Sequence, residues 1–181
     1  GGALGIDLGI KDLATLSDGT VIPNPHSFKT GERQLRRAQK ALSRKTKGSK
    51  RRAKARERVA RLHAHVVNRR HDALNKLTTM LSRTYSDISI EDLNVAGMVK
   101  NHRLAKAVQD ASFYELRRQL EYKTAKTGAK LHVIDRWYPS SKTCSNCGSV
   151  KTKLSLKERT YKCENCGLVI DRDLNAAINI Q

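Results

Sequence analysis

The chain has 181 residues, and its 36 lysines and arginines against 17 aspartates and glutamates give a net charge of +19. So large an excess of one sign repels itself unless a polyanion binds, which favours a nucleic-acid partner and leaves an anionic membrane surface as the alternative. No run of about 18 apolar residues is present, so we expect no membrane-spanning helix, and from the first residues we expect no secretory leader. The chain starts without methionine, so we expect it to be part of a longer protein.

The first predicted elements are three short strands, at residues 3–8, 13–16 and 20–22. Each is a short apolar run, and the Asp18-Gly19 pair before the third is typical of a tight hairpin turn. Asp7 interrupts the first run and has an apolar residue on each side. An ionised carboxylate inside a strand is unfavourable unless something compensates its charge, so Asp7 is a candidate functional residue.

Residues 32–83 are predicted to form a helical hairpin, with a break at residues 48–49. The second helix carries an apolar stripe at spacings of three and four, formed by Val59, Leu62, Val66, Ala73, Leu77 and Leu81. Between residues 33 and 70 the one acid is Glu57. The basic outer face is either a solvated surface or a contact for nucleic acid, and we favour the contact because charges of nearly one sign repel without a partner.

Strands and helices alternate in the rest of the chain. A strand around Ile88 and Ile90 ends at Glu91, and it is followed by a helix at 104–127, a strand at 130–135 and a short final helix. Alternation of this kind after an initial meander is typical of a mixed sheet with helices on its faces. We therefore predict an α/β fold of the RNase H-like kind.

Two knuckles, CSNCG and CENCG, interrupt this pattern before the final helix. They contain the pairs Cys144/Cys147 and Cys163/Cys166, with fifteen residues between Cys147 and Cys163, which is the spacing of a four-cysteine zinc ribbon. The glycine after each pair lets the backbone curl around the metal, and the segment between the pairs is expected to form a hairpin. Four thiolates would fill the coordination of zinc, so the ion would be structural; an iron site or two redox pairs are the alternatives.

Three acids in the predicted fold form a candidate catalytic group: Asp7, Glu91 and Asp173. Each alone has a simpler interpretation, as a loop cap or as the partner of an arginine. In an RNase H-like sheet, however, the first and fourth strands are neighbours about 4.8 Å apart, and an acid from the last helix would complete the group. Two divalent ions about 3.5–4 Å apart would then stabilise the attacking and leaving oxygens of a phosphodiester. Oxygen ligands favour Mg²⁺ or Mn²⁺.

The motifs around these residues resemble those of the transposon-encoded TnpB (OrfB) proteins, relatives of the compact type V CRISPR effectors. The segments that carry the resemblance are GIDLGIKDLAT, ISIEDLNVAGM, CSNCG, CENCG and DRDLNAAINI. The resemblance covers the whole chain and implies a RuvC-type nuclease with a zinc ribbon. It also implies that Asp7, Glu91 and Asp173 are the catalytic acids of an RNA-guided DNA endonuclease, with Asp171 and Asn175 beside them.

The same resemblance sets expectations for domains, partners and location. It implies a nuclease core at 1–137 that contains a helical insertion at 30–85, a zinc ribbon at 138–169 and a closing motif and helix at 170–181. DNA, as target and displaced strands, is the expected partner in a prokaryotic cytoplasm. A guide RNA is also expected, together with an N-terminal half that this chain lacks. The alternatives are a guide-independent RuvC-like resolvase or single-strand nuclease, and a non-catalytic DNA-binding fragment.

Overall fold

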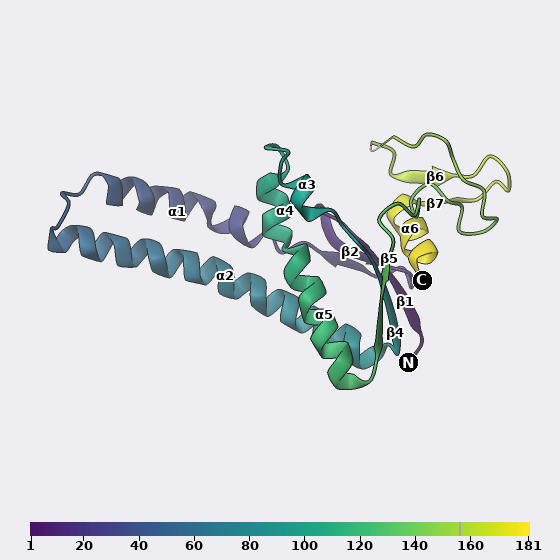
Figure 1. Cartoon of the computed structure of the whole chain (residues 1–181). Helices are drawn as coiled ribbons and strands as arrows, with labels where there is room; N and C mark the ends of the chain where they lie inside the picture. The colour runs from purple at the N-terminus through teal and green to yellow at the C-terminus, as the bar shows by residue number, and fades with distance from the viewer. Residues whose placement is uncertain (156) are drawn as a thin grey trace. The chain divides into compact units, whose positions relative to one another are not determined.

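The computed structural model describes residues 1–155 and 157–181, and a five-stranded mixed sheet lies at its centre (Figure 1). The strands are β1 (Ala3–Leu8), β2 (Asp12–Leu16), β3 (Val21–Pro23), β4 (Asp87–Glu91) and β5 (Lys130–Ile134). Their order in the sheet is β3-β2-β1-β4-β5, with β1 antiparallel to β2 and parallel to β4. The predicted α/β class and the predicted pairing of the first and fourth strands are confirmed.

The two faces of this sheet are covered by different helices. Side chains that alternate along β1 and β4 form one apolar face, which contains Leu4, Ile6, Ile88 and Ile90, all fully buried. On the other face, a Cβ atom at Gly5 would lie 2.0 Å from the carbonyl oxygen of Ala177, so α6 (Arg172–Ile180) rests directly on the backbone of β1. Figure 1 shows α5 (Phe113–Thr127) and α6 on opposite sides of the sheet.

The helices follow the predicted periodicity with three differences. They are α1 (Ser27–Ser43), α2 (Lys50–Thr84), α3 (Val95–Met98), α4 (Ala105–Ala111), α5 and α6. The predicted hairpin helix starts at Ser27 rather than at residue 32, and it includes Gly31, where a Cβ atom would lie 2.8 Å from Cγ2 of Val66. The predicted helix at 104–127 is two helices, since Ser112 has a left-handed backbone (φ 55°) that ends α4 and begins α5. The short α3 was not predicted.

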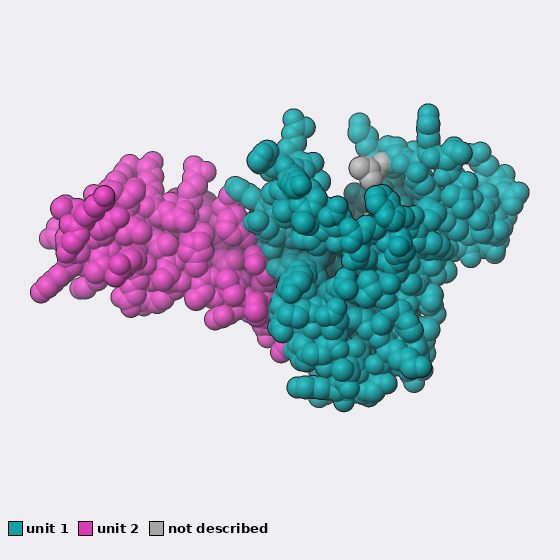
Figure 2. Space-filling model, in the orientation of Figure 1, with its two compact units in different colours: residues 1–24, 77–181 teal, residues 25–76 magenta. Residues whose placement is uncertain are grey.

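The chain divides into two compact units, shown in different colours in Figure 2. Residues 1–24 and 77–181 form the unit with the sheet, and residues 25–76 form a helical unit from α1 and most of α2. The predicted apolar stripe of α2 is confirmed, since each of its six residues is buried or half-buried. None of the helices in the described residues is long and apolar enough to cross a membrane.

The cysteine segment forms a small two-stranded ribbon of β6 (Thr160–Lys162) and β7 (Val169–Asp171). Tyr161 is fully buried between Cys144 and Cys163, and its hydroxyl donates to the carbonyl oxygen of Lys142 at 3.1 Å. The predicted ribbon segment also includes Leu156, which lies outside the described residues. A core this small cannot stabilise itself by apolar burial alone, so the ribbon depends on its cysteines.

Candidate functional site

Both knuckles have the backbone that a metal turn requires. The amide of Gly148 donates to the carbonyl oxygen of Cys144 at 2.9 Å, and that of Gly167 donates to Cys163 at 3.1 Å. Both glycines have a left-handed backbone (φ 73° and 75°), a conformation that side chains disfavour. The predicted role of these glycines is confirmed.

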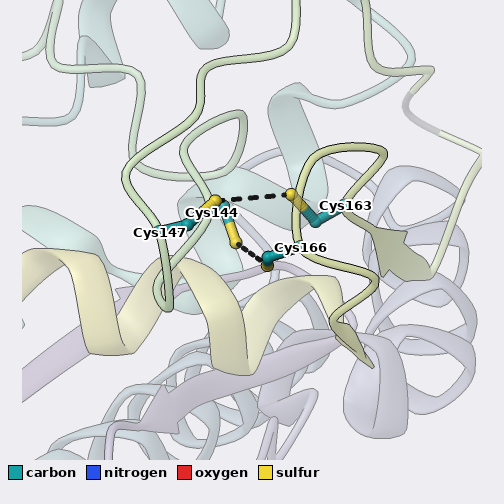
Figure 3. A group of neighbouring side chains, drawn as sticks. All are labelled: Cys144, Cys147, Cys163 and Cys166. Atoms are coloured by element: carbon teal, nitrogen blue, oxygen red, sulfur yellow. Dashed lines mark hydrogen bonds between the residues drawn. The ribbon is translucent and has the colours of Figure 1, made fainter.

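The four cysteine sulfurs converge on one point, as Figure 3 shows. All four Sγ atoms lie within 4.8 Å of one another, with 3.7 Å between Cys144 and Cys166 and 3.6 Å between Cys147 and Cys163. Zinc–sulfur bonds of about 2.3 Å in a tetrahedron give sulfur–sulfur edges of about 3.8 Å, so the group fits a Zn²⁺ ion. Four protein ligands leave no open position, and the metal suited to this group is therefore a structural one.

Neighbouring amides favour the thiolate form that metal binding requires. The side chain of Asn146 donates to Sγ of Cys166 at 3.5 Å, and this hydrogen bond lowers the pKa of Cys166 to about 6. Asn165 donates in the same way to Cys147 at 3.5 Å and lowers the pKa of that thiol. N–H···S hydrogen bonds of this kind orient the ligands and stabilise their charge.

The ribbon is fastened to α6 by two asparagines. Asn175 is 0% exposed; its amide donates to the carbonyl oxygen of Thr143 at 2.7 Å and accepts from the backbone of Ser145 at 3.0 Å. Asn179 donates to Ser140 and Thr143 at 2.8 and 2.7 Å. The structure therefore uses Asn175 to anchor the first knuckle, a role that its position in the sequence did not indicate.

The second end of the ribbon continues directly into α6. Asp171 is the last residue of β7 and also the N-cap of α6, where its carboxylate accepts from the amides of Asp173 and Leu174 at 2.9 and 3.0 Å. Carboxylates are favourable at this position because the first amides of a helix lack partners. The cap fixes where the first turn of α6 begins, and with it the position of Asp173.

The three predicted acids lie at the same end of the sheet. Ile6 and Ile90 are partners in the parallel ladder, so the next residues, Asp7 and Glu91, lie side by side on the face that α6 covers. Asp173 belongs to the first turn of α6. The local sequence sets these positions, because an alternating strand turns every second side chain to the same face.

The three acids interact electrostatically. Burial, followed by the negative charges of Glu91 and Asp173, raises the pKa of Asp7 from 3.8 to about 8, against the opposing effect of Arg172. Desolvation and like charge are the two causes that raise the pKa of a carboxyl group. The Asp7 side chain therefore holds a proton at neutral pH unless a cation neutralises the cluster.

Each of the other two acids has further partners. Glu91 accepts a hydrogen bond from the hydroxyl of Ser140. Asp173 accepts from the guanidinium of Arg172 at 2.8 and 3.0 Å, and Arg159 lies 3.5 Å from its second oxygen. The three acids thus form an open cluster, whereas the cysteines are the one group in the described chain whose ligand atoms converge as a closed metal site.

The raised pKa of Asp7 predicts how stability depends on pH. Between about pH 4 and pH 8 the folded protein binds a proton that the unfolded chain releases, so the free energy of unfolding falls as the pH rises. The Asp7→Asn variant lacks this charge and should be more stable than the wild type at pH 8, by up to about 5 kcal/mol, but not at pH 4. Urea denaturation at both pH values, without Mg²⁺ or Mn²⁺ and with zinc retained, measures the difference.

Asp87→Asn is the matched control for this measurement. Asp87 lies on the same strand as Glu91, and the hydrogen bond from His132 lowers the pKa of its carboxyl group. Its replacement should therefore give no gain in stability at pH 8. Equal stability of Asp7→Asn and the wild type at pH 8 would contradict the raised pKa.

Comparison with known proteins identifies the family. Residues 1–102 match the OrfB_IS605 family model, described as "Probable transposase", and residues 113–180 match the Cas12f1-like TNB domain. The chain belongs to the OrfB (TnpB) family. It is 52% identical over 178 residues to a Streptomyces pristinaespiralis protein named "Putative RNA-guided DNA endonuclease", across 98% of this chain and 44% of that protein.

Other members and a solved structure agree with this assignment. The chain is 35% identical over 192 residues to the Escherichia coli K12 protein "Putative RNA-guided DNA endonuclease InsQ", across 98% of this chain and 48% of that protein. A Cas12f1–sgRNA–target DNA complex contains the same fold, with a TM-score of 0.68 at 18% identity, over 98% of this chain and 48% of the Cas12f1 chain. The OrfB-family chain thus spans less than half the length of these relatives.

Proposed function

We propose that this chain is the catalytic lobe of an RNA-guided DNA endonuclease, in which Asp7, Glu91 and Asp173 hold two divalent metal ions. The observation that carries the proposal is the raised pKa of Asp7, caused by burial and by the charges of Glu91 and Asp173. Acids from β1, β4 and α6 that repel one another are unfavourable for folding, but they are the ligands that a phosphodiester hydrolase needs.

The acid cluster suits Mg²⁺ or Mn²⁺ because hard divalent cations prefer carboxylate oxygens. Bound there, two such ions would lower the pKa of the attacking water and stabilise the leaving oxygen. The chain itself supplies the geometry: the ladder fixes Asp7 beside Glu91, and the Asp171 cap fixes Asp173. Arg172 and Arg159, which contact Asp173, would attract the phosphate of the strand to be cut.

Charge and the names of the relatives support the substrate assignment. A net charge of +19 favours a polyanion, and the relatives named above carry the description RNA-guided DNA endonuclease. We assign guide RNA and both DNA strands as partners, contacted by the basic hairpin and the ribbon. On this proposal, residues 1–137 are the nuclease core with its helical insertion, 138–169 the ribbon and 170–181 the closing motif.

Cleavage of labelled single-stranded DNA with Mg²⁺, with and without total RNA from the expression host, tests the proposal. The wild type should cut, the Asp173→Ala variant should not, and Glu164→Ala, which removes an exposed acid of the ribbon, should cut like the wild type. A change of cut sites on adding RNA supports guiding, whereas cutting that ignores RNA identifies a guide-independent nuclease. DNA binding without any cutting would contradict the nuclease function of this chain.

A further inference from the structure

A cleft of about 380 Å³ opens at the end of the sheet. Glu91 is the one acid of the cluster that lines it, and no described residue of the zinc ribbon does. The cleft lies where β1 and β4 end and α5 begins. Its lining includes Leu8, Ile90, Phe113, Tyr114, Arg117 and Arg136. The cleft thus has apolar walls with guanidinium groups, and its volume is in the range of small-molecule sites, about 300–1,000 Å³.

The start of α5 presents two aromatic rings to this cleft in different ways. Phe113 is 3% exposed and forms part of the wall, whereas Tyr114 is 73% exposed. Both follow Ser112, whose left-handed backbone (φ 55°) is unfavourable for a residue with a side chain. A straight helix through Ser112 would rotate the two rings to other positions, so the strained residue sets the shape of the cleft.

The guanidinium groups are held in place by one carboxylate. Asp92 accepts from Nη1 of Arg117 at 2.8 Å and from Nε of Arg136 at 3.0 Å. Asp92 directly follows Glu91 at the end of β4, so both arginines are tied to the strand that carries an acid of the cluster. Planar guanidinium groups fixed in this way stack on bases and donate to their edges.

Glu91 joins the cleft to the acid cluster. It lines the cleft, and it lies beside Asp7 because Ile6 and Ile90, the residues before them, are partners in the parallel ladder of β1 and β4. The cleft lies on the α5 side of the sheet and the acid cluster on the α6 side, and the two meet at the end of the sheet, at Glu91. A strand that bends around this end would place a base in the cleft and its phosphate at the acids. The occupant must combine a planar apolar face with polar edges and be linked to a phosphate, which is the chemistry of a nucleotide.

We propose that this cleft binds one unstacked nucleobase of the DNA strand being cut, next to the scissile phosphate, with Tyr114 as the stacking ring. The inference rests on the proposed nuclease function and adds a subsite to it. Bases in a duplex are stacked and paired, so the cleft would select single-stranded DNA at the acids. Tyr114 would stack on the base and so orient the strand, and it takes no part in proton transfer.

Binding of two oligonucleotides tests this subsite without any cleavage. One is a single strand of about eight nucleotides, and the other has the same phosphates but no bases. All proteins carry Asp7→Ala, which prevents cutting. Adding Tyr114→Ala should weaken binding of the intact strand about tenfold and leave binding of the abasic strand unchanged, because one base–aromatic stack is lost. Fluorescence anisotropy measures both affinities.

Two variants control for the loss of an aromatic ring. Tyr122 also lies on α5 and is exposed among cationic side chains, but it does not line the cleft, so Tyr122→Ala should bind both strands like the parent. Tyr114→Phe keeps the ring and should retain the affinity for the intact strand. The subsite is excluded if Tyr114→Ala binds the intact strand as tightly as Tyr122→Ala does. It is also excluded if Tyr114→Ala weakens binding of both strands equally, or if the parent protein does not bind the intact strand. Cleavage by Asp7→Ala at the wild-type rate would instead contradict the proposed nuclease.

Discussion

Replacement of Asp7 by Ala should lower the rate of DNA cleavage about a thousandfold or more while DNA binding stays close to that of the wild type. Glu91 and Asp173 both raise the pKa of Asp7, so Asp7 interacts with both of the other acids, and its loss removes one ligand of the proposed metal pair. Binding on this proposal depends mainly on basic residues distributed over the chain, and one half-buried acid contributes little to it. Cleavage of labelled DNA and a filter-binding titration measure the two effects separately.

Asp87→Ala is the control for the loss of an acid from the sheet. Asp87 starts β4, the strand that Glu91 ends, and its carboxylate contacts His132. Its removal should leave the cleavage rate within about twofold of the wild type, as is usual for a surface substitution. If Asp7→Ala cut at the wild-type rate, or lost binding and cleavage together, the catalytic assignment of Asp7 would be wrong.

Replacement of Cys163 by Ser should release the metal, unfold the ribbon and lower the cleavage rate at least about a hundredfold. Metal binding contributes about 10–16 kcal/mol to folding in zinc-finger peptides, far more than the ribbon's small apolar core supplies. The loss reaches the acids because β7 continues into α6, where Asp171 caps the turn that contains Asp173. Zinc content, hydrogen exchange of residues 138–171 and the cleavage rate are the three measurements.

Lys162→Ser is the control within the same ribbon. Lys162 is exposed next to Cys163 and ligates nothing in the cysteine group, so this variant should keep its zinc and most of its activity. A Cys163→Ser protein that has lost zinc but cuts at the wild-type rate would show that the position of Asp173 does not depend on the ribbon.

Elements with strong local signals were predictable, and their ends were not. The stripe of α2 is set by residues three and four apart, and the strand at Ile88 and Ile90 by simple alternation, so both were found. The break at Ser112 was missed because a single serine does not by itself end a helical pattern, and its left-handed backbone is visible only in the structure, where it ends α4 and begins α5. The early start of α1 was missed because glycine disfavours helix in a sequence pattern. The structure shows that Gly31 is within the helix, at a place where a Cβ atom would be too close to Val66.

The sequence by itself determined the zinc ribbon, the family and the candidate acids, because each depends on residues close together in the chain or on motifs in a known order. Tertiary structure decided what no spacing encodes: that Asn175 anchors the ribbon, that Arg159 contacts Asp173, and that a cleft opens beside Glu91. The physical reason is that these features join different elements of the chain, through hydrogen bonds, ion pairs and packing that exist only in the folded protein.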